Sequence, residues 1–378
     1  MKGLIIIGCS DYNTLGCIRG FWQKGVDFTL LLVSDEKRKM ILKSQVVKDY
    51  VVVATEGEAV KWLLAHADEA NGTVLLPTSD KAESLIDLHC EELGKCFSFP
   101  HANHQGEVTR MMDKDVQVEM ARKAGLNVPK TAYYHRGDAI PEGLAYPAIV
   151  KQERSTEGRK RKMLVCNNES DLKNAIEHLP ETNDFLIQQY VRRDYELLLI
   201  GCRLSDGRVW MPAVFKKERW MLKGGDGSYG VISTKVPDYF KQTEAVERLL
   251  EEMNYYGPFS IEFGVEQGKP YFYEVNMRND GTSHYYYPAG VYVPYVYYLD
   301  RIGNLKDKDL AVEEKEHYFI DELGDIRNFF HGLSLHRWLK DIRKANAYKY
   351  YWKGDNAPFR AITKKYFRIY LQNDLWIN

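Results

Sequence analysis

Short apolar runs alternate with amphipathic stretches over residues 1–100. The runs GLIIIG, DFTLLLVS, DYVVVAT and TVLLPTSD are typical of buried strands, and TLGCIRGFWQKG has a helical pattern that ends at Gly25. Strands that alternate with helices predict right-handed βαβ units around a parallel sheet. We therefore expect an α/β fold that opens with a Rossmann-like domain over residues 1–105.

Residues 258–288 predict a β-hairpin with acidic side chains on one face. The runs SIEFGV and PYFYEVN are rich in β-branched and aromatic residues, and a polar turn containing Gly268 separates them. Glu262 and Glu274 are equidistant from Gly268, so an uninterrupted hairpin would place them opposite each other, with Asn276 on the same face. Opposed carboxylates repel each other. Two carboxylates and an amide oxygen suit a Mg²⁺ ion that is shared with phosphates.

Arg278 follows this hairpin at once and offers a permanently charged fork of donors to a phosphate or a carboxylate. The alternative is an edge hairpin whose charges are simply solvated, but both strands are flanked by apolar residues. The stretch therefore predicts a site for a metal ion and phosphate.

Glu262, the run Glu274-Val275-Asn276 and Arg278 resemble the metal-binding hairpin of the ATP-grasp ligases. The resemblance covers roughly residues 1–303, and its elements follow one another in the family's order. It implies three parts: a pre-ATP-grasp domain at 1–105, a two-lobed α+β ATP-grasp domain at 106–303 with its lid at about 131–190, and a helical C-terminal extension at 304–378.

The resemblance also implies roles within a nucleotide site. A hinge backbone would read adenine, an acid would hold the ribose hydroxyls, and lysines would reach the phosphates. The implied ATP-binding residues are Lys114, Lys151, Gln188, Gln189, Tyr190, Val191 and Glu196. The implied metal ligands, for two Mg²⁺ ions that Mn²⁺ can replace, are Glu262, Glu274 and Asn276. The implied catalytic cations are Lys151 and Arg278.

The loop after Lys151 departs from the family pattern. Family loops here are richer in glycine, whereas residues 153–162 contain only Gly158 among five Lys and Arg side chains. The extra charge could grip phosphate or serve an anionic second substrate, and so short a run is also typical of a solvated hairpin tip. The sequence leaves these alternatives open.

Several polar side chains are candidates for binding a second substrate. Two follow predicted parallel strands, whose carboxyl ends form ligand clefts, although each is equally typical of a helix N-cap. Two lie in VFKKERWMLKGGDGSYGVIS, which predicts a long glycine-rich loop, and two lie in the polar turn after the hairpin. The candidates are Ser10, Asp80, Arg219, Lys223, Asn279 and Gly281.

Composition is ordinary for a soluble globular protein, with 44% hydrophobic residues and a net charge of −1. No early apolar run is long enough to cross a membrane, and the start MKGLIIIGCS lacks the features of a secretory signal. The six cysteines are scattered without CxxC pairs, as reduced core residues are. We expect a cytoplasmic protein.

The distal part of the C-terminal extension is basic and aromatic. Leu335 to Arg368 contains ten Lys and Arg against two acidic residues. Amphipathic helices packed on the ATP-grasp domain, with their cations outward, explain this pattern. A second interpretation is an anionic or membrane-linked acceptor bound here, which would make the protein peripheral to the membrane. No nucleic-acid motif is present, so no nucleic-acid partner is expected, and a homodimer is left open.

Family membership implies a ligase that joins a small-molecule carboxylate to an amine through an acyl phosphate and releases ADP and phosphate. The run EVNMRNDG is similar to the carbamoyl-phosphate-synthase-like branch, which includes D-aspartate ligases. An amino-acid ligase acting on a cell-envelope or capsule intermediate is the resulting hypothesis. The alternatives are a ligase that makes a dipeptide or a purine- or cofactor-type product, and a nucleotide-binding scaffold without turnover.

Overall fold

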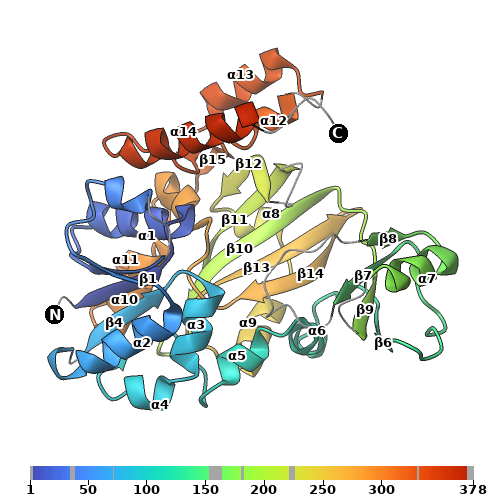
Figure 1. The fold of residues 1–378 in the computed structure, drawn as a ribbon, viewed down its shortest axis with the longest axis horizontal. Coiled ribbons are helices and arrows are strands. Elements are labelled where there is room, and N and C mark those ends of the chain that lie inside the picture. The colour runs from blue at the N-terminus through green and yellow to red at the C-terminus, as the bar shows by residue number, and fades with distance from the viewer. Residues whose placement is uncertain are drawn as a thin grey trace.

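The computed structural model describes residues 3–34, 39–70, 72–152, 164–179, 183–220, 226–329 and 332–372, and the strands within these ranges form three sheets. Figure 1 shows a five-stranded sheet at the left, a seven-stranded sheet in the middle and a four-stranded sheet at the right. The mixed α/β class expected from the sequence is confirmed.

The first sheet is parallel and has the order β3-β2-β1-β4-β5. Every residue of β1, β2 and β4 is buried, which explains why these strands are continuous apolar runs. The order places the carboxyl ends of β1 and β4 side by side. The strands are β1 (Leu4–Gly8), β2 (Thr29–Val33), β3 (Tyr50–Val53), β4 (Thr73–Pro77) and β5 (Phe97–Ser98); the helices are α1 (Tyr12–Gln23), η1 (Ile41–Lys43), α2 (Glu56–Ala65), η2 (Ala67–Glu69), α3 (Asp80–Asp87) and α4 (Cys90–Leu93).

Two short helices, α5 (Glu107–Met111) and α6 (Lys114–Lys123), lead to the next domain. Taken alone, the run MMDKDVQVEMARKAGLNVPKT predicts one helix that ends at Gly125, and the structure corrects this to two helices. Asp113 adopts an extended conformation, with φ −69° and ψ 129°, and a new helix starts after it. Lys114 is therefore the first residue of α6, which packs against the acidic hairpin.

The four-stranded sheet forms a small lobe with the order β6-β9-β7-β8, in which all pairs are antiparallel. A single helix, α7 (Glu169–Glu177), packs on it around Leu172, Phe185 and Ile187. Figure 1 shows this lobe set apart at one end of the molecule. The strands are β6 (Thr131–His135), β7 (Ala148–Gln152), β8 (Leu164–Cys166) and β9 (Asp184–Gln189).

The seven-stranded sheet carries the acidic hairpin at one edge, in the order β14-β13-β10-β11-β12-β15-β16. Alternate residues of β10 pack on different layers, because Leu197 and Leu199 meet α8 (Val236–Tyr239) and α9 (Thr243–Met253), whereas Leu198 and Ile200 join the core shared with the first sheet. The strands are β10 (Tyr195–Arg203), β11 (Val209–Trp220), β12 (Gly227–Ser233), β13 (Gly257–Glu266), β14 (Lys269–Asn276), β15 (Glu316–Ile320) and β16 (Ala347–Tyr348).

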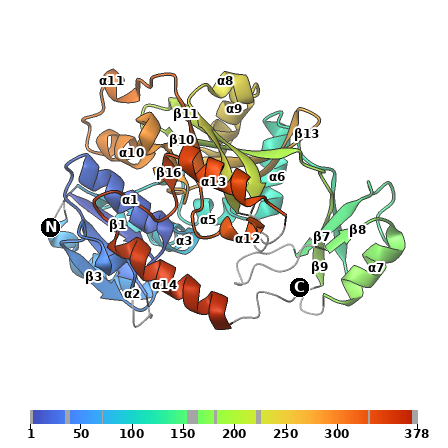
Figure 2. The same ribbon diagram turned by 90° about the horizontal axis from the view of Figure 1, so that it is seen from above.

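The C-terminal extension is not purely helical as expected, because β15 pairs with β12 and carries β16, so that both strands extend the central sheet. Figure 2 shows α13 lying over the middle of the molecule and α14 over the N-terminal domain. The remaining helices are η3 (Ser283–Ala289), α10 (Val293–Arg301), α11 (Asp307–Leu310), α12 (Ile326–Phe329), α13 (Leu335–Lys344) and α14 (Ala357–Gln372).

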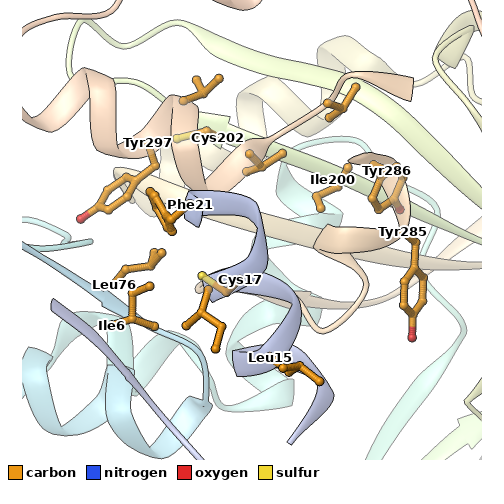
Figure 3. Close-up of a cluster of buried hydrophobic side chains, with 14 of the residues drawn as sticks. Ile6, Leu15, Cys17, Phe21, Leu76, Ile200, Cys202, Tyr285, Tyr286 and Tyr297 are labelled. Atoms are coloured by element: carbon orange, nitrogen blue, oxygen red, sulfur yellow. The ribbon is translucent and has the colours of Figure 1, made fainter. Parts of the chain in front are cut away.

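One apolar core joins the first sheet to the central sheet. Figure 3 shows α1 between them, with Phe21 and Cys17 meeting Ile6 and Leu76 from the first sheet. From the other side come Ile200 and Cys202 of β10 together with the tyrosines of η3 and α10, Tyr285, Tyr286 and Tyr297. The sheets are consequently one packed body, with little room for relative movement at this core.

A buried ion pair fastens the C-terminal extension to α1. Arg19 Nε lies 2.8 Å from Asp355 Oδ2, and the two side chains are each only 1% exposed. Arg19 also donates to the carbonyl oxygen of Tyr350, and Ser44 Oγ donates to Asp355. Removing one partner of such a pair leaves a buried charge unpaired. Residues 350–355 are therefore an integral part of the fold.

Candidate active site

The acidic hairpin is formed by β13 and β14. Gln267 and Gly268 have φ values of 51° and 77°, which suits a two-residue turn whose twist matches paired strands. A bulge next to Glu262 leaves Tyr273 as an extra residue in β14, and Glu262 pairs with Glu274 directly beyond it. The predicted opposition of the two carboxylates is confirmed, and it depends on this bulge.

A row of charges continues from the hairpin across the neighbouring strands. Lys217 Nζ on β11 lies 3.3 Å from Glu196 Oε2 on β10 and 3.1 Å from Glu262 Oε2 on β13. Burial lowers the pKa of Lys217, but the two carboxylates outweigh it and the pKa is raised. These side chains share a sheet face with Leu198, so the charges begin where the apolar core ends.

The two hairpin carboxylates each have a lysine beside them. Burial raises the pKa of Glu262 to about 7, against the pull of Lys217 and helped by repulsion from Glu274. Lys114 Nζ lies 3.2 Å from Glu274 Oε2, and this carboxylate raises the pKa of Lys114. A cation placed between the carboxylates would remove their repulsion and favour the ionised form of Glu262.

The residues present fit a Mg²⁺ site. Glu262 and Glu274 offer hard oxygen ligands, and Asn276 lies on the same face two residues along β14. Asn276 Oδ1 accepts a hydrogen bond from Arg278 Nη2 at 3.2 Å. Within the described ranges, no three or more His, Cys, Asp or Glu side chains are grouped to hold a metal ion. The set therefore depends on the asparagine oxygen and on oxygens supplied by phosphate.

Arg278 connects the hairpin to the parallel sheet. Its Nε donates to Asp80 Oδ1 at 2.6 Å, and its Nη2 to Asp80 Oδ2 at 3.4 Å. Asp80 is the first residue of α3, at the carboxyl end of β4. The Arg278 side chain is 14% exposed and that of Asp80 is 62% exposed. An anionic ligand that displaced Asp80 would thus meet a guanidinium already held in place.

A small cavity of about 10 Å³ lies where the small lobe meets α6 and the hairpin. Two of the predicted ATP-binding residues, Lys114 and Gln188, line it. Gln188 Nε2 donates to Thr131 Oγ1 at 3.1 Å, which fixes the amide at the cavity wall. The other lining residues are Asp115, Val118, Tyr133, Leu186 and Tyr273.

Glu262 gives a prediction for stability against pH. Its carboxyl has a pKa of about 7 in the fold and 4.5 as the ordinary value, so between these pH values the folded chain holds a proton that the unfolded chain has lost. The contribution of Glu262 to the free energy of unfolding therefore falls as pH rises from 4.5 to 7. Glu262→Gln removes this loss, so without metal the variant gains on the order of 2 kcal/mol relative to wild type between pH 5 and pH 8.

Urea unfolding of both proteins at pH 5, 6, 7 and 8 measures this difference. Glu119→Gln is the control, because Glu119 pairs with Arg122 on the exposed side of α6. A difference between Glu262→Gln and wild type that stays constant across this pH range would show that Glu262 is not held in its protonated form.

Residues 119–290 match the family model of the ATP-grasp domain. The chain contains an ATP-grasp domain. This match includes the small lobe, residues 188–191 and the acidic hairpin, whereas Lys114 and Asp80 lie before it.

Relatives support the match. The chain is 23% identical over 186 residues to a formate-dependent phosphoribosylglycinamide formyltransferase of Nitratiruptor sp., covering 46% of this chain and 45% of the relative. It is 27% identical over 143 residues to a carbamoyl phosphate synthase large chain of Sulfolobus acidocaldarius, covering 36% and 13%. The crystal structure of an L-amino acid ligase from Bacillus licheniformis superposes with a TM-score of 0.63 at 14% identity, covering 83% of this chain and 78% of the other.

The matched stretches span less than half the length of these two curated relatives. The likeness to the solved structure establishes the fold alone, since its sequence identity is low. Through the parts of the chain that the structure describes, no helix is both long and apolar enough to cross a bilayer.

Three of the substrate candidates lie at the junction of the ATP-grasp domain with the parallel sheet. Asn279 is fully buried and its Nδ2 donates to Asn13 Oδ1, so the structure makes it a structural link and not a cleft residue. Gly281 faces the ring of Tyr12, where an added Cβ would come within 2.8 Å. Ser10 Oγ accepts the N–H of Ile41.

Arg219 corrects another expectation. It lies on β11 and not in a loop, because the strand continues to Trp220. Its Nε and Nη2 bind Asp325 at 2.8 and 2.6 Å, and its Nη1 binds Asp341 at 2.8 Å, so the guanidinium fastens the C-terminal extension to the ATP-grasp domain. Lys223 and the loop 153–162 lie outside the described residues. Lys151 is placed only by its backbone, on β7 opposite Leu186.

Sequence reasoning missed two cations of the site, Lys217 and Arg193. Arg193 Nε lies 2.8 Å from Glu196 Oε1, so both oxygens of this carboxylate have a cationic partner. The signal for Lys217 was the turn at Asp206 and Gly207, from which Glu196 and Lys217 are nearly equidistant along β10 and β11. No comparable signal identified Arg193, because its role depends on how the segment between β9 and β10 folds back toward Glu196.

Proposed function

We propose that this protein is an ATP-dependent ligase that joins a carboxylate to an amine and releases ADP and phosphate. The observation that carries the proposal is the opposed pair Glu262 and Glu274, flanked by Lys217 and Lys114 and followed by Arg278. Acidic ligands for a divalent cation stand here beside cations that suit phosphate oxygens. That combination serves phosphoryl transfer, where positioning and charge do most of the work.

The reaction has two steps. An oxygen of the substrate carboxylate attacks the γ-phosphorus of ATP, the bond to the β–γ bridging oxygen breaks, and ADP leaves. The nitrogen of the amine then attacks the acyl carbon and loses a proton, and the C–O bond to phosphate breaks. Phosphate leaves with one oxygen of the original carboxylate, so no nucleophile from the protein is needed.

The chain's own residues would bind and orient the reactants. Glu196 would hold the ribose, the hinge from Gln188 to Val191 would read adenine, and Lys114 and Lys151 would bind the triphosphate. Arg278 would hold the transferring phosphoryl group or the carboxylate in place of Asp80. Mg²⁺ held by Glu262, Glu274 and Asn276 would neutralise negative charge on the phosphates.

Small molecules are the proposed substrates, and one of the two is an amino acid. The fold shared with an L-amino acid ligase supports amino-acid ligation, whereas the similarity to phosphoribosylglycinamide formyltransferase supports a purine-type product as the second candidate. Joining the amino acid to a cell-envelope or capsule intermediate is the finer form of the proposal, and the surface of α13 is what supports it.

The test is a screen of carboxylates and amines that reads phosphate release with Mg²⁺ and ATP, followed by mass spectrometry of the ligated product. The proposal expects release that requires both a carboxylate and an amine, with ADP as the nucleotide product. Tight binding of ATP without turnover for any pair would favour a nucleotide-binding scaffold. Release with phosphoribosyl amines alone would favour the purine-type ligase.

Helix α13 presents an exposed apolar and basic surface. Leu335 and Leu339, one turn apart, are 51% and 37% exposed, and the exposed side chains around them include Arg337, Lys340 and Arg343. Cations contribute about 1 kcal/mol each near an anionic membrane, and this attraction is screened by salt. We infer that this surface of α13 binds an anionic acceptor.

Anionic vesicles are therefore expected to co-sediment with the protein at low salt and to release it at high salt. The double variant Arg337→Glu with Lys340→Glu should lose this binding, whereas neutral vesicles should not bind either protein. If the wild-type protein does not co-sediment with anionic vesicles at any salt concentration, the role of α13 is only to pack against β15.

A further inference from the structure

Lys217 lies between the two carboxylates to which we assign different ligands. Its ammonium is 3.3 Å from Glu196, the proposed ribose ligand, and 3.1 Å from Glu262, the proposed metal ligand. The side chain is 6% exposed. Gly227 covers its stem so closely that an added Cβ would come within 3.0 Å of Lys217 Cγ. Glycine thus leaves room for a lysine that has little freedom to move elsewhere.

Each carboxylate also has a second charged neighbour on its far side. Arg193 Nε binds the other oxygen of Glu196 at 2.8 Å, and the Arg193 side chain is 28% exposed, so it can exchange with a ligand more easily than the buried Lys217 can. Glu262 faces Glu274, which pairs with Lys114 at 3.2 Å. The charges therefore form one connected series: Arg193 is positive, Glu196 negative, Lys217 positive, Glu262 and Glu274 both negative, and Lys114 positive.

We propose that Lys217 couples the ribose site to the metal site, so that a divalent cation at Glu262 strengthens the binding of the ribose hydroxyls at Glu196. A cation that binds Glu262 repels the ammonium of Lys217. The ammonium then interacts more strongly with Glu196. Glu196 then depends less on Arg193, whose departure frees Oε1 to accept the ribose hydroxyls. Coupling of this kind is reciprocal, so the ribose also strengthens metal binding. The inference rests on the proposed roles of Glu196 and Glu262.

The test compares ATP with 2′,3′-dideoxy-ATP by calorimetry, with Mg²⁺ and with a chelator in its place. Both nucleotides carry the same triphosphate, so the effect of the metal on the phosphates cancels when the two affinities are divided. We expect Mg²⁺ to increase the preference of the wild-type protein for ATP by about fivefold or more, the range of typical coupling between sites. This measurement needs no mutation.

Variants then assign the coupling to Lys217. Lys217→Met should bind both nucleotides with a preference that Mg²⁺ does not change, and Lys217→Arg should restore the change. Lys216→Met is the control, because Lys216 points to the other face of β11 and interacts with Tyr195 and Glu218. If Lys217→Met does not fold, the wild-type comparison still decides whether coupling exists.

If wild type prefers ATP over 2′,3′-dideoxy-ATP by the same factor with and without Mg²⁺, the inference is overturned. The proposed function still stands in that case, provided that Mg²⁺ and the ribose hydroxyls each strengthen nucleotide binding separately. Coupling that persists in Lys217→Met overturns the role of the lysine. If the protein does not distinguish the two nucleotides at all, or binds neither, the inference fails together with the assignment of Glu196.

Discussion

Glu274→Gln is expected to lower turnover by roughly a hundredfold to ten-thousandfold, while the melting temperature stays close to that of wild type. The amide keeps the size of the side chain but removes one of the two opposed charges that would hold Mg²⁺. Metal stabilisation of a transferring phosphoryl group is worth several kcal/mol, and each 1.36 kcal/mol is tenfold in rate. The fold loses little because the Glu274 side chain is 34% exposed, and its pair with Lys114 is partly screened by solvent.

Steady-state rates of phosphate release, with thermal melts of the same preparations, measure both parts of this prediction. Glu119→Gln on the exposed side of α6 is the control for removing a carboxylate near the site. Wild-type rates in Glu274→Gln would make the hairpin a purely structural feature. A large fall in its melting temperature would likewise contradict the metal assignment.

Lys114→Met is expected to weaken ATP binding by roughly tenfold to a hundredfold, because a hydrogen bond to a charged group is worth about 1.5–3 kcal/mol. Lys114 lines the cavity beside the hinge and faces Glu274, so its ammonium lies where the triphosphate would meet the metal ligands. The same substitution at Lys123, exposed at the other end of α6, should leave affinity unchanged. Calorimetric titration with ATP measures each affinity.

Lys151→Met should show a loss of similar size, since the proposal assigns this lysine to the same triphosphate. If Lys114→Met and Lys151→Met both bind ATP with wild-type affinity, the proposed ATP site beside these two lysines is wrong. An effect in Lys114→Met alone would instead move Lys151 out of the proposed ATP site.

The pairing of the two hairpin carboxylates could be predicted from the sequence, but the bulge that permits it could not. Local spacing around Gly268 was enough to pair Glu262 with Glu274, because strand pairing is set by the turn. The turn centre actually lies between Gln267 and Gly268, and the bulge at Tyr273 compensates for this shift of register. Nothing in the sequence marks that bulge, so the correct pairing followed from two offsetting features of the strand.

Long-range partners explain the failures. Arg219 looked like a cleft cation because its acidic partners lie more than a hundred residues away along the chain, at Asp325 and Asp341. Asn279 looked exposed in a polar turn, and only the packing of α1 against that turn shows it to be buried. A purely helical extension was expected because a short strand such as β15 carries a weak signal until β12 provides its partner.

Oxygen-18 transfer tests the central claim most directly. With the carboxylate and amine found in the screen, the carboxylate is labelled in both oxygens and the released phosphate is examined by mass spectrometry or ³¹P NMR. An acyl phosphate intermediate predicts ADP as the nucleotide product and one labelled oxygen in each phosphate. Release of AMP and pyrophosphate, or of phosphate without the label, would contradict the account.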